Sequence, residues 1–409
     1  MSPVRILHTS DWHLGQHFMG KTRQDEHQAL IDWLIEQVQV QQVDAVLIAG
    51  DIFDTGSPPS YARELYNHLV LGLRSIGVSL WVLGGNHDSV ATLSESRQLL
   101  SCLGTTVIPA VAERIEQQVL VLRQRDGTAA AILCAIPYIR PRDVQQSRAG
   151  QSAEEKQLGL QEAIAQHYEQ VYQRACQERE RLGLSLPIVA TGHLTTVGAS
   201  ASESVREIYV GALQAFPSAA FPAADYIALG HIHKPQKVGG QAHIRYSGSP
   251  IPLSFDEANR QQEVLLVDLD DSGLVAVSPL AVPCFQALVS VQGDLPSLAL
   301  QIREAAQRGG GERPVWLDVQ VQSDDYLSDL QARIEAMTAG LPVEVLRLRR
   351  QRADRAATLP ATLKVTLDEL SPLEVFNKRL EQEALEDDLC APLRIRYLDI
   401  LAQLQASKP

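Results

Sequence analysis

Five short polar motifs, nearly all placed directly after an apolar run, constrain this chain more than any other feature. They are Asp11-Trp12-His13, Gly50-Asp51, Gly84-Gly85-Asn86-His87-Asp88, Gly192-His193 and Gly230-His231-Ile232-His233. The apolar runs, residues 4–7, 43–49, 78–83, 188–190 and 226–229, are typical of buried strands. In open α/β sheets, ligand sites collect at the carboxyl ends of strands. These strand ends therefore predict one shared site.

The residue types in the motifs predict metal ligands. Two Asp, one Asn and several His, with no Cys, form an oxygen and nitrogen shell suited to Mn²⁺, Fe or Zn²⁺. The set is too large for one ion, and a bridging carboxylate can hold two ions roughly 3.5–4 Å apart for an in-line phosphoryl displacement. Asp51 is the expected bridge. Asp11 and His13 stand two residues apart, as do His231 and His233, so both side chains of each pair point to one side of an extended segment.

The third motif contains a ligand and a candidate acid. Asn86 offers a neutral carbonyl oxygen, whereas His87 beside it need not bind metal and is suited to general acid catalysis. The other histidines, at positions 8, 17, 27, 68, 167 and 243, lie outside the motif positions, and a structural role is the simpler interpretation. This holds for His8 in particular, which is expected to face away from Asp11.

In their order and spacing, the motifs resemble the signature of the calcineurin-like metallophosphoesterases. That signature is Asp-x-His, Gly-Asp, Gly-Asn-His-Asp/Glu, Gly-His and Gly-His-x-His. Longer strings, residues 6–15 and 49–59, are similar to the nuclease subunits of bacterial SbcCD complexes, and this resemblance covers essentially the whole chain. It implies an α/β fold with a four-layer α/β/β/α core, a small α+β capping domain and C-terminal helices.

The resemblance also implies roles for the motif residues. Two divalent ions, with Mn²⁺ as the first candidate, are expected. One ion is assigned to Asp11, His13, Asp51 and His233, and the other to Asp51, Asn86, His193 and His231. His87 is expected to protonate the leaving 3′ oxygen, with Asp88 orienting it. Asp54 stands where some relatives carry a histidine, so its role stays open.

The activity implied is that of a DNA nuclease in repair, recombination and replication. It comprises ATP-dependent 3′ to 5′ digestion of double strands and endonuclease action on single strands and hairpins. The implied partner is the SbcC ATPase, with two copies of each protein, and a homodimer is an alternative assembly. Two other functions stay open: a small-molecule phosphodiesterase, such as one for cyclic nucleotides, and a metal-bound scaffold that regulates an ATPase.

Composition limits the class of protein. The chain has 409 residues, of which 45% are hydrophobic and 21% charged, and no apolar stretch approaches the ~20 residues that cross a bilayer. The five cysteines are scattered and form no Cys-x-x-Cys pair, which fits reduced thiols in the cytoplasm. A net charge of −13 opposes DNA binding unless basic residues are clustered. Candidate phosphate contacts near the motifs are Lys21, Arg23, Arg63, Lys234 and Lys237.

Three segments are expected along the chain: a nuclease domain over 1–283, a capping domain over 284–356, and a linker with a helical partner-binding region over 357–409. Helices are predicted at 24–39, 60–75 and 158–181, with a surface loop over 142–156. The capping domain should alternate strands at 285–291, 314–321 and 343–348 with helices at 295–307 and 328–337. Its basic run, Arg347, Arg349, Arg350, Arg352 and Arg355, is either a DNA contact or a solvated strand edge.

The tail carries a helix start at Ser371-Pro372-Leu373-Glu374, because it combines an N-cap, a proline at the first helical position and a capping-box Glu. A second helix is expected from about Pro392, with Leu398, Leu401 and Leu404 along one stripe. The resemblance implies that Leu373, Phe376 and Leu380 dock on the base of the SbcC coiled coil. Packing on the chain's own cap is the alternative.

Overall fold

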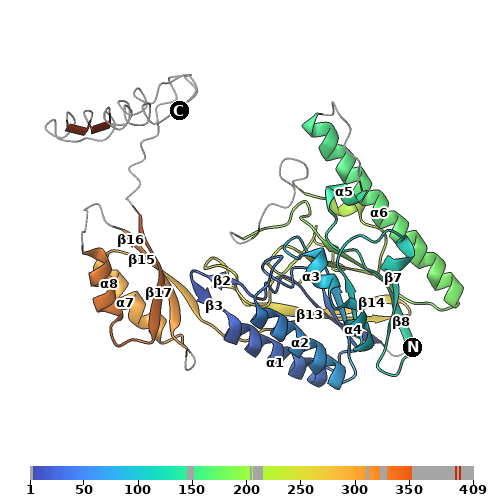
Figure 1. The fold of residues 1–409 in the computed structure, drawn as a ribbon, viewed down its shortest axis with the longest axis horizontal. Helices are drawn as coiled ribbons and strands as arrows, with labels where there is room; N and C mark the ends of the chain where they lie inside the picture. Colours follow the sequence, from blue (N-terminus) through green and yellow to red (C-terminus); the bar gives the residue numbers. More distant parts are fainter. Residues whose placement is uncertain are drawn as a thin grey trace.

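The computed structural model describes residues 3–144, 152–202, 205, 215–309, 313–322, 329–351, 392–393 and 396–397. Its main body contains two six-stranded sheets (Figure 1). The strand order of the first sheet is β14 (Gly273–Ala281), β13 (Glu263–Asp270), β1 (Val4–Thr9), β4 (Ala45–Ile48), β5 (Ser79–Leu83) and β6 (Thr105–Ile108). The order of the second is β11 (Gln236–Lys237), β12 (Ile244–Tyr246), β10 (Tyr226–Gly230), β9 (Ile188–His193), β8 (Ala129–Cys134) and β7 (Val119–Arg123).

The central strands of both sheets are parallel. In the first sheet β1, β4, β5 and β6 run in one direction, and in the second β8, β9, β10 and β12 do so. Strands of a parallel sheet are covered on both faces and therefore read as continuous apolar runs. The segment β4 fits this rule, since all four of its residues are buried. The parallel arrangement brings the carboxyl ends of neighbouring strands to one edge of each sheet.

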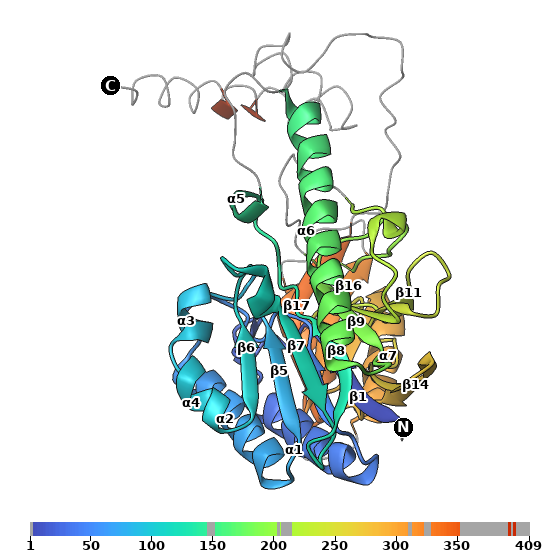
Figure 2. The same cartoon turned by 90° about the vertical axis from the view of Figure 1, so that its right-hand side faces the viewer.

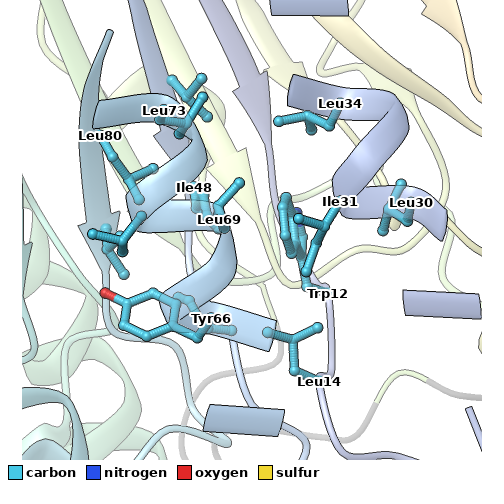
Figure 3. Close-up of a cluster of buried hydrophobic side chains, with 14 of the residues drawn as sticks. Trp12, Leu14, Leu30, Ile31, Leu34, Ile48, Tyr66, Leu69, Leu73 and Leu80 are labelled. Carbon is cyan, nitrogen blue, oxygen red and sulfur yellow. The ribbon is translucent and has the colours of Figure 1, made fainter. Parts of the chain in front are cut away.

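Helices cover the outer face of each sheet. On the first sheet lie α1 (Gln24–Val40) and α2 (Ser60–Ser75), and they bury a cluster that includes Trp12, Leu34, Leu69 and Leu80 (Figure 3). On the second sheet lies the long helix α6 (Ala153–Leu182), drawn in green in Figure 2. A third apolar cluster fills the space between the sheets. The layers are thus α/β/β/α, and the predicted four-layer core is confirmed.

The helix α6 begins earlier than its apolar spacing predicted. Ser152 and Glu155 form a capping box, in which each side chain accepts a hydrogen bond from the other residue's backbone N–H. This cap moves the start from the predicted Leu158 to Ala153, into what was expected to be a loop. The first residues of that loop belong to a short helix, α5 (Pro141–Val144). Other short elements are α3 (Val90–Ser94), α4 (Arg97–Cys102) and a hairpin of β2 (His17–Phe18) and β3 (Lys21–Thr22).

A smaller unit follows β14 along the chain. Its three parallel strands are β15 (Leu288–Gly293), β16 (Val315–Gln322) and β17 (Val343–Gln351). The helices α7 (Leu295–Ala306) and α8 (Leu330–Thr338) pack on one face of this sheet around a separate apolar cluster. The predicted order of strand, helix, strand, helix and strand is confirmed. We call this unit the cap, residues 288–351.

The other face of the cap sheet contacts the main body at the β2–β3 hairpin, as Figure 1 shows. Phe18 of the hairpin stacks on Trp316 of β16, with ring centroids 5.8 Å apart and planes inclined by 9°. Phe255 and Leu288 complete this buried cluster. Lys21 pairs with Glu344 across the same seam. The predicted tail anchors Leu373, Phe376, Leu380, Leu398, Leu401 and Leu404 lie outside the described residues, as do Arg352 and Arg355.

Candidate metal centre

The five motifs meet at the carboxyl ends of strands from both sheets. Asp11 and His13 follow β1, Asp51 follows β4, and Asn86 and His87 follow β5 in the first sheet. In the second sheet His193 is the last residue of β9, and His231 and His233 follow β10. The strands β1, β4 and β5 are neighbours, as are β9 and β10. All the predicted site residues are therefore brought to one place between the two sheets.

These residues form two clusters of possible ligand atoms. One consists of Asp11, His13 and His233, and the other of Asp51, His193 and His231; within each cluster the atoms lie within 4.8 Å of one another. A third group of the same kind joins His13 to Asp54 and His87. Asn86 Oδ1 joins the second cluster, 2.8 Å from His193 Nε2 and 3.2 Å from His231 Nδ1.

Asp51 connects the clusters. Its Oδ2 atom lies 3.2 Å from His193 Nε2 in one cluster and 3.7 Å from His13 Nε2 in the other. A single carboxylate oxygen thus faces both sets of nitrogens. This is the position that a bridging ligand between two ions must occupy.

The donor set fits divalent cations on a further ground. His13 Nδ1 lies 3.1 Å from Asp54 Oδ1, while its Nε2 atom is buried and has no hydrogen-bond partner. A buried polar atom without a partner costs about 1–3 kcal/mol. A cation bound between His13 and Asp51 would remove that cost, because a neutral imidazole nitrogen is a good ligand for transition metals.

The backbone at the site is unusual. Asp11, His13, Asp51 and His231 all have positive φ angles, between 49° and 91°, which non-glycine residues seldom adopt. Such conformations persist only where surrounding structure enforces them. Here the loops after β1 and β4 are joined by hydrogen bonds from Trp12 N to Asp51 O (2.9 Å) and from Leu14 N to Ile52 O (2.8 Å).

Gly50 shows why this motif requires a glycine. Its φ angle is 97°, and a Cβ atom there would lie 2.2 Å from His193 Nδ1. A larger residue would displace the histidine of the opposite sheet. The glycine therefore allows the two sheets' loops to approach each other.

Groups behind the ligands fix the rings. His193 Nδ1 lies 2.9 Å from the carbonyl oxygen of Ala49, and His233 Nδ1 lies 3.2 Å from Glu257 Oε1. Metal-binding histidines usually donate their second ring N–H to such a carbonyl or carboxylate, which sets the tautomer. Glu257 is 1% exposed and also accepts hydrogen bonds from Ser202 Oγ and Leu253 N. Sequence reasoning missed Glu257, because it follows no strand end and belongs to no motif.

His87 and Asp88 are held in different ways. His87 Nδ1 lies 2.8 Å from the backbone oxygen of Asp54, so this carbonyl orients the ring. The sequence alone assigned no role to Asp54. Asp88 instead accepts hydrogen bonds from the backbone N–H groups of Gly85, Ile52 and Phe53. These contacts differ from the expected one with the His87 ring, and they join the loop after β5 to the loop after β4.

Burial and close charges shift the acidities at the site. Burial disfavours protonation of His193, but the carboxylate of Asp51 outweighs it and raises the pKa of His193 to about 9. Burial would raise the pKa of Asp51, but the facing histidines lower it well below its usual value. For Asp88, burial and the nearby Asp51 raise the pKa to about 6, against the effect of its three amide donors. Burial and the neighbouring His193 lower the pKa of His231.

The histidine at position 8 has a structural environment, as predicted. His8 is buried, and its Nδ1 atom lies 2.9 Å from Tyr226 Oη between the sheets. Burial lowers the pKa of His8 to about 3, and the same effect lowers the pKa of His27. His27 contacts the backbone oxygen of Trp12 through Nε2, at 3.1 Å.

One predicted phosphate contact is wrong. Arg23 is fully buried beside Glu26, and it donates hydrogen bonds to Gln16 Oε1 and Pro252 O. It therefore braces the loops around the site and is not a surface cation. Lys21 and Arg63 pair with Glu344 and Glu95.

Comparisons with known proteins show the family of the chain. A family model described as calcineurin-like phosphoesterase matches residues 4–235, and one described as type 5 capsule protein repressor C-terminal domain matches residues 284–384. The SbcD protein of the nuclease SbcCD from Escherichia coli K12 is 52% identical over 387 residues, 94% of each chain. The SbcD protein of Rhodobacter capsulatus is 31% identical over 90% of this chain and 93% of its own length. A solved dimetal phosphatase from Danio rerio is 10% identical, with a TM-score of 0.36 over 68% of this chain and 99% of that chain, a likeness too distant to carry an argument.

The chain belongs to the calcineurin-like phosphoesterases, and it is a metal-dependent hydrolase. Within that class it belongs to the SbcD family, the metal-dependent nuclease subunits of SbcCD. In the part of the chain that the structure describes, no helix is both long enough and apolar enough to cross a membrane.

Proposed function

We propose that this chain hydrolyses DNA phosphodiester bonds with two Mn²⁺ ions. Asp11, His13, Asp51 and His233 would hold one ion, and the second would be held by Asp51, Asn86, His193 and His231. The observation that carries this proposal is the position of Asp51 Oδ2, which faces a histidine nitrogen of each cluster. When bound, the ions would neutralise charge on the phosphoryl oxygens and activate the attacking water.

The protein's own residues then orient the substrate and move the proton. His87 is half-buried at the cavity beside the clusters, and its Nδ1 atom is fixed on Asp54 O. Because the backbone carbonyl accepts from the Nδ1–H group, the ring must carry a second proton to act as an acid. The Nε2–H group of the protonated ring is the donor that we assign to the leaving 3′ oxygen. Asp88 holds the loops after β4 and β5 together and so sets the distance between Asp51 and His87, whose backbone N–H donates to Asp51 Oδ1 at 2.9 Å.

We further propose that the chain acts with the SbcC ATPase, two copies of each, in the cytoplasm. The relatives' names place them in an SbcCD complex. The activity would be ATP-dependent 3′ to 5′ digestion of double strands and cleavage of single strands and hairpins, in DNA repair, recombination and replication. The docking segment would be the tail with Leu373, Phe376 and Leu380. The four cysteines among the described residues are unpaired, which fits a reducing compartment.

The test compares substrates and partners in one assay. The purified chain, with and without SbcC, is given hairpin DNA or a cyclic nucleotide in Mn²⁺ or in Mg²⁺. Hydrolysis of DNA that depends on Mn²⁺, and on ATP once SbcC is present, supports the proposal. Faster turnover of the cyclic nucleotide would favour a small-molecule phosphodiesterase. The scaffold function would be favoured if the Asp51→Ala variant still assembled with SbcC, regulated its ATPase normally and kept its full biological activity.

A further inference from the structure

A cavity of about 400 Å³ lies beside the metal centre, and the cap forms part of its wall. The main body contributes His13, His87 and His233, together with Phe255. The cap contributes Arg347 from β17. A side chain far along the chain from the last motif thus borders the space that leads to the ligands.

Arg347 is held in a fixed position. Its Nε and Nη2 atoms donate to both carboxylate oxygens of Asp318, at 2.9 and 2.7 Å, in a bidentate pair. Asp318, on β16, is 2% exposed. The guanidinium of Arg347 also lies over the ring of Phe255, 5.5 Å from its centroid. Contacts from two elements therefore fix the side chain, so little entropy is lost when a ligand binds it.

An irregularity in the sheet produces this arrangement. Leu317 pairs with Val345, but its neighbour Asp318 pairs with Arg347, so β17 contains one extra residue at Leu346. A bulge of this kind re-aims the side chains that follow it and is common beside active sites. Without the extra residue, the register would place residue 346 opposite Asp318. Leu346 packs instead against the aromatic cluster between the cap and the main body.

Charged groups of both signs meet at this place, since Asp54 and Arg347 both line the cavity. Arg349 also donates to Asp318 Oδ2, at 2.7 Å, so two guanidinium groups share one carboxylate. Among the described residues that line the cavity, Arg347 is the one with a permanent positive charge. A planar guanidinium presents several N–H donors in a geometry that matches phosphate oxygens. The chain as a whole has a net charge of −13, which opposes binding of the DNA polyanion.

We propose that Arg347 is a phosphate-binding residue of the nuclease, which contacts a backbone phosphate next to the scissile one. This inference rests on the proposed DNA hydrolysis at the metal centre. The bulge, the bidentate pair and the placement of the cap then serve the same purpose, because together they place a permanent positive charge at the cavity. The described main-body residues that line this cavity supply no such charge. A substrate with a single phosphate would occupy the metal centre without reaching Arg347.

The experiment uses the full chain loaded with Mn²⁺ and compares Arg347→Gln with Arg349→Gln. Both variants remove one arginine from the same carboxylate, but only the first removes a side chain that lines the cavity. For Arg347→Gln we expect kcat/KM on an oligonucleotide to fall roughly 10-fold or more, because a hydrogen bond to a charged group is lost. The plot of log(kcat/KM) against log salt should become less steep by about one unit.

Three readouts separate this role from damage to the fold or to the metal centre. Arg347→Gln should keep its bound Mn²⁺ and its turnover of bis(nitrophenyl) phosphate, a diester with one phosphate. Its melting temperature should fall, because Asp318 loses one partner, but should stay above the assay temperature. Arg347→Lys, which keeps the charge, should recover the salt dependence but only part of the rate. Arg349→Gln should lose less kcat/KM on DNA than Arg347→Gln does, and it should resemble the unmodified chain on the nitrophenyl ester.

Two results would overturn the inference. One is an Arg347→Gln variant with unchanged DNA kinetics and salt dependence. The other is an equal loss on DNA and on the nitrophenyl ester, which would assign the effect to the metal centre. Asp51→Ala distinguishes this failure from failure of the proposed function. If that variant still cleaves DNA, the function itself is wrong, whereas an inactive Asp51→Ala with a normal Arg347→Gln refutes Arg347 alone.

Discussion

The variant Glu257→Gln tests whether buried groups behind the metal centre control its affinity. In the structure Glu257 Oε1 accepts from Ser202 Oγ at 2.5 Å and lies 3.2 Å from His233 Nδ1, while Oε2 accepts from Leu253 N at 2.7 Å. Glutamine has the same shape but only one acceptor oxygen. If that oxygen stays opposite Leu253 N, the new NH₂ group faces His233.

The magnitude follows from the tautomer of His233. An NH₂ donor next to Nδ1 favours the ring with its proton on Nε2, the nitrogen that is left for a metal. Loss of such an orienting partner typically lowers metal affinity 10–100-fold, or about 1.4–2.7 kcal/mol. The opposite placement sets NH₂ against the Leu253 N–H and leaves a buried donor unpaired, at a cost of about 1–3 kcal/mol. Neither placement restores the original contacts.

Calorimetric titration of the metal-free chain with Mn²⁺ measures this loss of metal affinity. We expect one of two sites to weaken in Glu257→Gln while the other keeps its affinity. Glu263→Gln is the matched control, since it makes the same chemical change at a partly exposed position of β13. Two sites of unchanged affinity in a folded Glu257→Gln variant would refute the reasoning.

Three further predictions concern the same region. Asp51→Ala should lose both metals and all hydrolysis, whereas His193→Ala should keep partial occupancy; a full complement of Mn²⁺ in Asp51→Ala by elemental analysis would contradict the bridging role. His87→Gln should keep its metals but lower kcat on DNA by roughly 10²–10⁴-fold, with a smaller loss on a nitrophenyl diester whose leaving group needs no acid; equal losses would point to another role. Burial lowers the pKa of His8 from 6.5 to about 3, so the unfolded chain takes up a proton that the folded chain does not, and stability falls as pH drops below 6.5 towards 3. His8→Gln should reduce that slope by about 1.4 kcal/mol per pH unit in urea unfolding of the metal-free chain, and an unchanged slope would disprove the assignment.

The sequence predicted the central strands well, because parallel strands buried on both faces give unbroken apolar runs. The helix α2 was predicted at its observed bounds, since its apolar positions recur at helical spacing. The strands β6, β7, β8 and β14 were not predicted. Of these, β6, β7 and β14 lie at sheet edges, and β14 is mostly exposed or partly exposed and contains Pro279, so it lacks the apolar signal of a central strand. The strand β8 is internal and largely buried, but none of the five motifs follows it.

The motifs predicted which residues meet, because a strand end fixes the position of the residue that follows it. They could not predict groups that approach from distant loops. Glu257 and Arg347 reach the site through a loop after β12 and through a register shift in the cap, and neither leaves a local pattern. The prediction for Arg23 was wrong because a basic residue beside a motif was expected at the surface. In the structure Arg23 is buried, and Glu26 neutralises its charge.

The ligands of each proposed ion come from both sheets of the sandwich. Asp11 and His13 belong to the first sheet and His233 to the second, while the other cluster joins Asp51 with His193 and His231. Bound ions would therefore act as cross-links between two halves that otherwise meet mainly through apolar packing and a few hydrogen bonds. By mass action, free metal at 100 times its dissociation constant adds about 2.7 kcal/mol per site to the folded state. Metal supply would then determine how tightly the two sheets are held together, and a chain deprived of divalent metal would become vulnerable to proteolysis between the sheets as well as inactive.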